Sequence, residues 1–293
     1  MMTKKKLIWP NSSLSGLCDR LIDLHLMAAL AEILDRQLIL EWKKTTELND
    51  FQRVTWSSAR QLDYLVENFT RYFYLPRNIR FVKLISDEID DSCVFFNHYL
   101  GGVYSPKTFF DKYCGNFCTY ESFENIYYKK INEFKPTSKL LDLIGILPEI
   151  NISVHLRRGD KVTSDPDFVQ IHTTELSDLE ILTGKCFSDQ LSKYQPRNPN
   201  VFICSDSELA KKSFIENNCS SCNVIDINNQ FYDYEKTYID IFLLSISDVI
   251  ILSQRHSNFS LFSSLINKKK LIYLYESKLI GDGAYKNCER YLI

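Results

Sequence analysis

Two arginines, a carboxylate and a lysine follow directly on an apolar segment near the middle of this chain. The apolar segment is Ile152–Leu156, and it continues as Arg157-Arg158-Gly159-Asp160-Lys161. A strand of an α/β sheet that opens into charge at its carboxyl end is typical of a ligand site. Neighbouring guanidinium groups suit a diphosphate, because each can donate two charge-assisted hydrogen bonds to phosphate oxygens. The alternative is a strand that ends in a solvated surface loop.

Polar residues interrupt apolar segments at three places further along the chain. Asp206 follows a mostly apolar run, Asp240 lies on an otherwise apolar helix, and Ser257-Asn258-Phe259-Ser260 separate an apolar strand from a helix. A buried carboxylate needs partners, and hydroxyl and amide groups at a helix N-terminus are a natural seat for phosphate. The alternatives are a helix cap at Asp206, an exposed acid at Asp240 and an ordinary capped loop after residue 252.

The elements that must position these residues form two series of strands and helices. In the first series, a strand at residues 7–9 is followed by a polar loop, a helix from Leu17 to about Arg36 and a strand at 37–42, which predicts a parallel sheet. This series continues with helices at 59–72, 106–113 and 120–134 and strands at 79–85 and 93–97. Residues 135–138 are expected to form a linker that also caps a helix at 139–147.

The second series predicts a Rossmann-like half of the chain. It comprises strands at 150–156, 200–205, 223–227, 249–252 and 271–274, and helices at 174–193, 208–217, 234–245 and 260–267. A final helix near residues 286–293 is expected to fold back on the first half. We therefore predict an α/β protein with two Rossmann-like domains, at 1–135 and 136–293, and a cleft between them.

The composition is that of a soluble globular protein. Of the 293 residues, 45% are hydrophobic and 25% are charged, and the formal net charge of −2 gives no reason to expect nucleic-acid binding. No run of about 18 apolar residues occurs, so no membrane span is expected. Only three apolar residues follow the lysines at positions 4–6, which is too few for a signal peptide. We expect a cytoplasmic location, with peripheral attachment to a membrane left open.

The spacing His155-x-Arg157-Arg158-x-Asp160 resembles the signature of the α-1,2/α-1,6 fucosyltransferase superfamily. Lys161, with an acid four residues later at Asp165, looks most like the α-1,6 branch, which includes the Nod-factor fucosyltransferases. Other matches follow in the family's order along the chain: Gly16, Asp19 and Arg20 in the first loop, then Asp206, Asp240 and Ser257-Asn258-Phe259-Ser260. The first loop departs from the family at Cys18, where a second glycine would allow close backbone approach, and alternatively it is a plain capped helix start.

This resemblance implies an inverting glycosyltransferase of the GT-B class that uses GDP-fucose. The donor site would lie in the C-terminal domain and the cleft, and the N-terminal domain would be the acceptor side. Arg157, supported by Arg158, would hold the β-phosphate, and Asp240 would read the guanine edge. His155 would point the same way as Arg157, because strand side chains alternate, and would contact the nucleoside. The first loop, Asp206 and residues 257–260 would complete the donor site.

The resemblance also implies the groups that act on the acceptor. Asp160 would orient the arginines, and Lys161 would fix the catalytic acid. Asp165 would be the base that takes the proton of the acceptor hydroxyl. Asp167 is the alternative base, because the loop up to His172 is longer here than in the family.

Metal chemistry has a competing signal in Asp165-Pro166-Asp167, which matches the D-x-D pattern that binds Mn²⁺ in other glycosyltransferases. The superfamily is metal-independent, since its arginines neutralise the leaving diphosphate, so we expect no metal and no cofactor besides the donor. The expected partners are a GDP-sugar and a glycan or glycolipid acceptor. Two alternatives stay open: a different GDP-sugar on the same scaffold, and a GDP-sugar-binding module that has lost catalysis.

Overall fold

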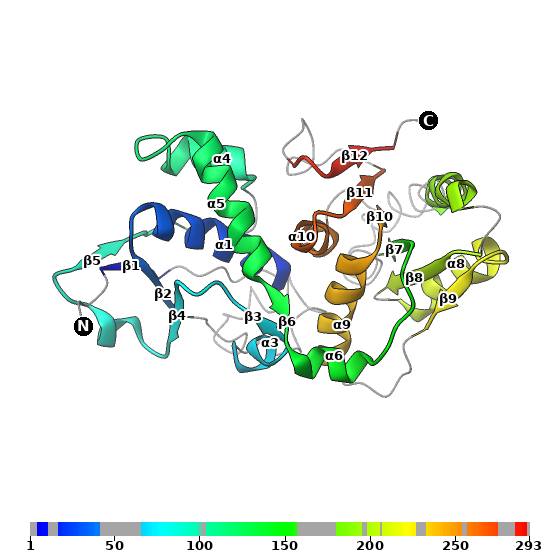
Figure 1. The fold of residues 1–293 in the computed structure, drawn as a ribbon, viewed down its shortest axis with the longest axis horizontal. Coiled ribbons are helices and arrows are strands. Elements are labelled where there is room, and N and C mark those ends of the chain that lie inside the picture. The colour runs from blue at the N-terminus through cyan, green and yellow to red at the C-terminus, as the bar shows by residue number, and fades with distance from the viewer. Residues whose placement is uncertain are drawn as a thin grey trace, which may run out of the picture. The chain divides into compact units, whose positions relative to one another are not determined.

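The computed structural model describes residues 5–10, 17–41, 66–98, 100, 104–156, 180–194, 198–205, 207–226, 233–253, 257–274 and 285–291. It divides into two compact units, residues 1–53 with 63–143 and residues 54–62 with 144–293. Each unit contains a parallel sheet with helices, so the predicted α/β fold class is confirmed (Figure 1). The predicted boundary after Lys135 stays a prediction.

The first unit contains a four-stranded parallel sheet in the order β4-β2-β1-β5. Its strands are β1 (Lys6–Trp9), β2 (Gln37–Glu41), β4 (Ile79–Val82) and β5 (Cys93–Phe95). The first strand in the sequence, β1, lies in the interior, where Leu7 pairs with Leu38 of β2 and with Val94 of β5. The strand predicted at 79–85 ends at Val82, and Ile85 begins a 3₁₀ helix instead.

Short polar side chains set the beginnings of the helices in this unit. Ser105 and Thr119 accept hydrogen bonds from the backbone N–H groups of Thr108 and Ser122, at 3.2 and 3.3 Å, and so satisfy donors that a helix start leaves free. The helices are α1 (Leu17–Ile33), α3 (Val66–Tyr72), η2 (Ile85–Glu88), α4 (Pro106–Tyr113), α5 (Tyr120–Glu133) and α6 (Ser138–Ile144). The part of the predicted helix before Val66 lies outside the described residues.

The segment predicted as a linker is paired. Lys135–Pro136 form a two-residue strand, β6, which pairs antiparallel with β3 (Phe73–Tyr74). Thr137 donates from its hydroxyl to the carbonyl of Arg71 at 2.7 Å and accepts from the N–H of Leu140 at 3.5 Å, so it caps α6 as predicted. The pairing could not be read from the segment itself, because its partner lies about sixty residues earlier in the chain.

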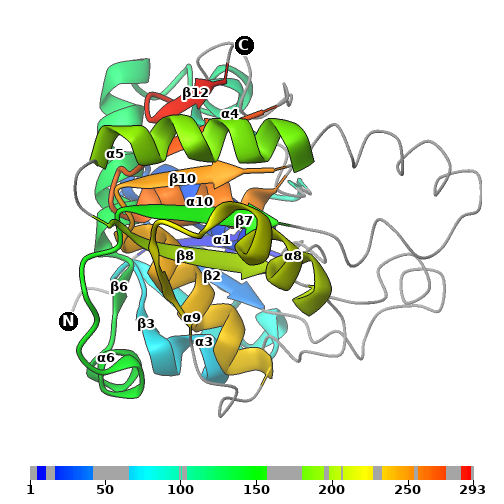
Figure 2. The ribbon, with the colours of Figure 1, turned by 90° about the vertical axis from the view of Figure 1, so that its right-hand side faces the viewer.

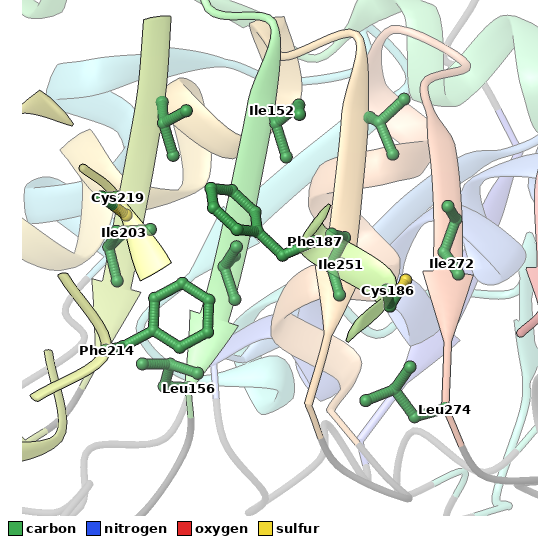
Figure 3. Packing of buried hydrophobic residues seen from close by; sticks show 13 residues of the cluster. Ile152, Leu156, Cys186, Phe187, Ile203, Phe214, Cys219, Ile251, Ile272 and Leu274 are labelled. Carbon is green, nitrogen blue, oxygen red and sulfur yellow. The ribbon is translucent and has the colours of Figure 1, made fainter. Parts of the chain in front are cut away.

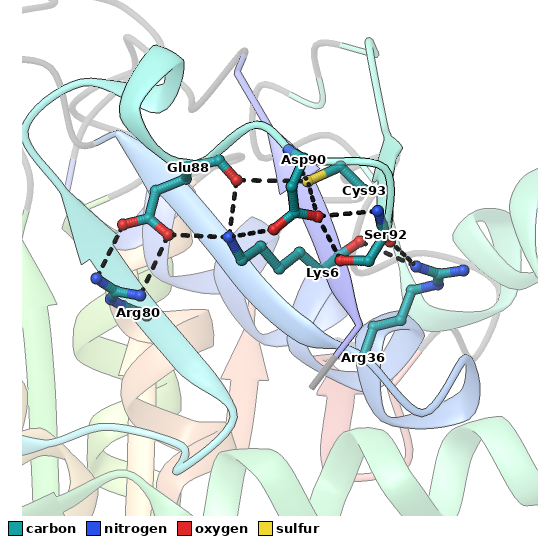
Figure 4. A network of polar contacts seen from close by, with 7 residues as sticks. All are labelled: Lys6, Arg36, Arg80, Glu88, Asp90, Ser92 and Cys93. Atoms are coloured by element: carbon teal, nitrogen blue, oxygen red, sulfur yellow. Dashed lines mark hydrogen bonds and ion pairs between the residues drawn. The ribbon is translucent and has the colours of Figure 1, made fainter. Parts of the chain in front are cut away.

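Charged side chains close the amino end of the first sheet (Figure 4). Lys6 at the start of β1 donates to the carboxylate of Asp90 at 2.9 Å, and Asp90 also accepts from the N–H of Ser92 at 2.9 Å. Glu88 contacts Lys6 at 3.3 Å and is held on its other side by Arg80 at 2.8 Å. Each of these four charges has an opposite charge beside it, so the four side chains largely neutralise one another.

The second unit contains a six-stranded parallel sheet in the order β12-β11-β10-β7-β8-β9. Its strands are β7 (Ile152–Leu156), β8 (Asn200–Ser205), β9 (Asn223–Ile225), β10 (Val249–Leu252), β11 (Lys270–Tyr273) and β12 (Cys288–Arg290). Its helices are a helix over residues 180–191, then η3 (Ser192–Tyr194), α8 (Glu208–Asn218), α9 (Asp233–Ile246) and α10 (Asn258–Ile266). Where the residues are described, these elements confirm the second predicted series within a few residues, apart from the last element. The start of the helix predicted at 174–193 and the end of the strand predicted at 223–227 lie outside the described residues.

The two faces of this sheet are covered by different helices (Figure 2). Because strand side chains alternate, Ile152, Val154 and Leu156 of β7 share one face, where they join an apolar cluster with Phe187 of the helix over 180–191 and Phe214 of α8. Figure 3 shows these rings lying across the strands. Ser153 and His155 point to the opposite face, which α9 and α10 cover.

The predicted C-terminal helix is wrong. Cys288–Arg290 form the edge strand β12, which pairs parallel with β11 and belongs to the second unit. The reason is the otherwise unpaired edge of β11, whose backbone hydrogen-bonds this segment at both of its ends. Leu271 N–H donates to the carbonyl of Asn287, and Tyr291 N–H donates to the carbonyl of Tyr273, both at 2.9 Å. Pairing with an available edge outweighs local helical preference.

Candidate functional site

The order of the second sheet defines one place where a ligand is expected. From β7 the chain adds β8 and β9 on one side, and then returns through α9 to add β10, β11 and β12 on the other. The strand order therefore reverses between β7 and β10. In open α/β sheets the crevice outside the carboxyl ends at such a switch point is the usual binding place. His155 pairs with Leu252 in register, so both strands end at this level.

A histidine joins the end of β7 to the start of α10 at this switch point. His155 is 5% exposed, its Nδ1 lies 2.6 Å from Oγ of Ser260 and 3.4 Å from Oγ of Ser257, and its ring centroid is 5.3 Å from that of Phe259. Ser253, directly after β10, donates from its hydroxyl to the carbonyl of His155 at 2.9 Å. The structure thus brings together four residues that the sequence analysis placed in one site.

The N-terminus of α10 is oriented by these contacts. Ser257 occupies the capping position but makes no side-chain capping hydrogen bond, and its hydroxyl lies toward His155 instead. Asn258 is the first residue of the helix. The first turn of an α-helix carries unpaired N–H groups and a partial positive charge, which attract an anion. A helix start fixed at the switch point therefore offers a seat for a phosphate group.

A carboxyl group lies on the same face of the sheet, one strand further along. Cys204 of β8 is the register partner of His155, and its thiol donates a hydrogen bond to the carboxylate of Asp240 on α9. Asp240 keeps some exposed surface but is densely surrounded by protein atoms, and this burial raises its pKa from 3.8 to about 7. The Cys204 hydrogen bond and the charges of Lys211 and Lys236 oppose that shift. Asp240 therefore titrates near neutral pH.

The remaining predicted residues are not brought to this place by the described part of the structure. Asp19 and Arg20 lie in the first turn of α1 in the first unit, where Arg20 is buried and Asp19 is half-buried. Other predicted site residues lie outside the described residues, namely Gly16, Arg157, Arg158, Asp160, Lys161, Asp165, the alternative Asp167, and Asp206. Their roles stay predictions.

Two residues of the site were not singled out by the sequence. Cys204 was interpreted as a small core residue, but it hydrogen-bonds Asp240. Ser253 holds the backbone of His155 through two hydrogen bonds, from its N–H at 3.2 Å and from its hydroxyl at 2.9 Å. The available signal was position, because both residues stand at or just after the carboxyl end of a predicted strand. Ser207, rather than an aspartate, is the described cap of α8.

The described residues contain neither a membrane-spanning helix nor a group of metal ligands. None of their helices combines the length and the apolar character that crossing a membrane requires. No three histidine, cysteine, aspartate or glutamate side chains within the described ranges are grouped as metal ligands would be. The Asp165-Pro166-Asp167 segment lies outside these ranges, and the expected absence of a metal there stays a prediction.

Solved structures share the fold of this chain, although sequence comparisons find no match. No protein-family model matches the sequence, and no curated protein matches it. The crystal structure of fucosyltransferase NodZ from Bradyrhizobium aligns with a TM-score of 0.51 at 13% identity, over 90% of this chain and 94% of that one. Its selenomethionine form gives 0.50 at 13% identity, over 90% and 93%. POFUT1 in complex with GDP aligns at 0.47 and 14% identity, over 92% and 98%.

The first two alignments show that this chain shares its fold with a glycosyltransferase of the GT-B type. Two parallel α/β sheets in separate units are the elements of that fold, and the second has the order 3-2-1-4-5-6 when its strands are numbered along the chain. At this level of identity the likeness concerns the fold alone, and function has to be argued from the site.

Proposed function

We propose that this chain is an inverting glycosyltransferase that transfers fucose from GDP-fucose to a hydroxyl group of a glycan or glycoconjugate. The observation that carries the proposal is the joint of His155, Ser257 and Ser260 at the switch point of the second sheet. The fold shared with a fucosyltransferase supports the class of reaction. The run from His155 to Lys161, which resembles the fucosyltransferase signature, supports the donor.

The described residues suggest how GDP would be bound. The N-terminus of α10 receives a phosphate group of GDP, and His155 acts as a positioning residue, since it is buried and holds Ser260. Asp240 in its ionised form accepts hydrogen bonds from the ring and amino N–H groups of guanine. Adenine and uracil do not offer this pair of neighbouring donors, so the carboxylate selects guanine.

In the proposed reaction, the acceptor hydroxyl oxygen attacks the anomeric carbon while the bond from that carbon to the β-phosphate oxygen breaks. Asp165 takes the hydroxyl proton, GDP leaves with the bonding electron pair, and the configuration at the anomeric carbon is inverted. Arg157 and Arg158 neutralise the charge that develops on GDP. The proposal needs no metal ion, because two guanidinium groups supply that positive charge.

A thermal-shift experiment with nucleotides tests the donor assignment. GDP in the presence of EDTA should stabilise the protein by roughly 2.7 kcal/mol at a concentration a hundredfold above its dissociation constant. UDP and CMP should shift the melting temperature much less. Equal shifts with UDP and GDP would contradict the guanine assignment, and loss of the GDP shift in EDTA would contradict the metal-free mechanism.

A different GDP-sugar is the second candidate donor. Its basis is that Asp240 reads the base and places no restriction on the sugar. Turnover of a panel of GDP-sugars with a common acceptor mixture separates the two donors. A protein that only binds GDP-sugars would instead show slow donor hydrolysis that does not depend on Asp165.

A further inference from the structure

The first sheet has a switch point of its own, between β1 and β5. The chain places β2 and β4 on one side of β1 and then adds β5 on the other. Trp9, the last residue of β1, donates from Nε1 to the carbonyl of His98 at 3.1 Å, and Phe96 N–H donates to the carbonyl of Ile8 at 2.8 Å. The segment after β5 is therefore anchored at the carboxyl end of β1, where an α/β sheet places its ligand.

Five aromatic side chains gather at this switch point, and we call Phe96, His98, Tyr104, Phe109 and Tyr113 the ring cluster. Tyr113 is central: its ring centroid lies 4.9 Å from Phe96, 5.1 Å from His98, 5.8 Å from Tyr104 and 5.1 Å from Phe109. Phe96 and Phe109 are buried, whereas Tyr104 and Tyr113 are half-buried and His98 is exposed. The ring cluster therefore presents aromatic surface to solvent on a packed base.

Lys112 of α4 adds a cation to the ring cluster. Its Nζ donates to the hydroxyl of Tyr104 at 2.7 Å, forms a second hydrogen bond with Tyr113, and lies 5.1 and 5.2 Å from the two ring centroids. These hydrogen bonds raise the pKa of Lys112, and the Lys112 ammonium lowers the pKa of Tyr104. An ammonium group has three N–H donors, so one remains after the two phenol oxygens are served.

The partners of Lys112 differ from those of three other lysines in this unit. Lys107, Lys129 and Lys130 each form an ion pair with a carboxylate. Lys112 has none among the residues that the structure describes, and its neighbours are phenol hydroxyls. Asp23 is buried nearby, and its charge raises the pKa of Tyr104. This effect is weaker than the lowering caused by Lys112. The Lys112 charge is thus held in place without being neutralised.

We propose that His98, Tyr104, Lys112 and Tyr113 form a saccharide-binding site at the switch point of the first sheet. A sugar ring exposes C–H groups on its faces and oxygens around its edge. Aromatic faces attract the C–H groups, and the ammonium and phenol groups hydrogen-bond the oxygens. Identifying this saccharide as the acceptor of the transfer rests on the proposed function, whereas its binding does not.

Calorimetric titration of the full chain without nucleotide tests the site. Cellotriose, chitotriose and trigalacturonic acid present neutral, N-acetylated and acidic sugar rings, and at least one should bind saturably. Lys112→Met keeps the apolar stem and removes the charged donor, so the dissociation constant should rise roughly tenfold or more. His98→Ala should raise it by a smaller factor of about two to ten. Tightest binding of the acidic trisaccharide would place a carboxylate at Lys112.

Lys107→Met is the matched control, because Lys107 lies on the same helix and pairs with Asp111 instead of the ring cluster. It should leave saccharide binding unchanged. Absence of saturable binding for all three saccharides would overturn the site, and so would equal affinities in Lys112→Met and Lys107→Met. GDP thermal shifts on the same proteins keep the two proposals apart. Lys112-dependent binding without a GDP shift would remove the proposed donor and leave the saccharide site standing.

Discussion

The two sheets place their first strand alike and differ in the side chains at its carboxyl end. In both units the first strand in sequence is interior, and later strands are added on opposite sides of it. At the carboxyl end of β7 the second sheet has a buried histidine, three serines and the start of α10. At the carboxyl end of β1 the first sheet has the ring cluster and Lys112. Topology therefore fixes where a ligand is expected, while the side chains decide its chemistry.

The two ends of the first sheet differ in a similar way. At the amino end Lys6, Arg80, Glu88 and Asp90 pair with one another (Figure 4). At the carboxyl end Lys112 is paired with no carboxylate of the described residues. Charges that satisfy one another support the fold, whereas a charge held by neutral partners remains able to bind a ligand. Variants in these regions should separate the two cases, from the largest expected effect to the smallest.

The largest effect should come from the proposed base. Asp165→Asn should cut transfer by about 10²–10⁴-fold and leave GDP affinity close to wild type, because the base acts on the acceptor. Asp167→Asn is the matched control and should be much milder. Kinetics and GDP titrations on both variants decide between them. If only Asp167→Asn loses activity, the base is Asp167, and if neither does, the chemistry lies elsewhere.

The next effect concerns the phosphate-binding arginine. Arg157→Lys should lower the turnover number by about 10²–10³-fold although the charge is kept, because lysine lacks the planar fork of donors. Arg80→Lys is the control from the first sheet, where Arg80 pairs with Glu88. It should leave turnover unchanged. Near-normal turnover of a folded Arg157→Lys protein would show that the segment after β7 is not the phosphate clamp.

The pH dependence of GDP binding tests Asp240. Only the ionised carboxylate can accept from guanine, and its pKa in the free protein is about 7. The dissociation constant of GDP should therefore be roughly tenfold higher at pH 6 than at pH 8, because about a tenth of the carboxyls are ionised at pH 6. Calorimetry across this range should show a flat profile for Asp240→Asn. A wild-type profile that is equally flat would remove Asp240 from the site.

Asp240 should also affect the stability of the free protein. Raising the pH should strengthen GDP binding but weaken this contribution to stability. Its folded pKa lies above its ordinary value, so the folded state binds the proton more tightly than the unfolded state. The resulting stabilisation is complete below about pH 4 and is lost as the pH rises toward 7. Asp240→Asn should therefore raise the melting temperature of the free protein at pH 8, relative to wild type, and change it less at pH 5. A lower melting temperature at pH 8 would contradict this.

The smallest effect is expected in the ion network of the first sheet. Hydrogen bonds from Ser92 and from the ammonium of Lys6 hold the pKa of Asp90 below its usual range. A lowered carboxyl pKa stabilises the folded state above the ordinary pKa, and this stabilisation is lost as the pH falls below it. Asp90→Asn should slightly lower the melting temperature at neutral pH, less so in high salt. Asp87→Asn is the control, because the Asp87 carboxylate accepts from the Ser86 hydroxyl and forms no ion pair with a described residue, so the melting temperature should stay unchanged.

Much of the fold was predictable because its local signals agree with its packing. The interior strands are apolar runs, and capping residues such as Ser105 stand where helices begin. The two-residue strand β6 and the edge strand β12 were missed because they depend on a partner. Glu289 and Arg290 carry no strand signal, and only the free edge of β11 makes them a strand.

Some residues of the candidate site could be singled out one by one in the sequence, but their arrangement could not. His155 and Ser260 could each be identified at the end of an element, whereas their hydrogen bond depends on the strand order. The contact between Cys204 and Asp240 likewise follows from α9 lying beneath β8. The ring cluster gave no signal, because Phe109 and Tyr113 have the four-residue spacing of an ordinary buried helix face.

The joint between β7 and α10 also bears on how the second unit folds. The hydrogen bond of His155 with Ser260 joins residues 105 positions apart, and that of Ser153 with Ser247 spans 94 positions. Closing such long loops costs chain entropy, which is recovered only after the intervening strands and helices have formed. We therefore expect this joint to form late in folding and to open early in unfolding. A nucleotide that binds there should slow unfolding far more than it speeds folding.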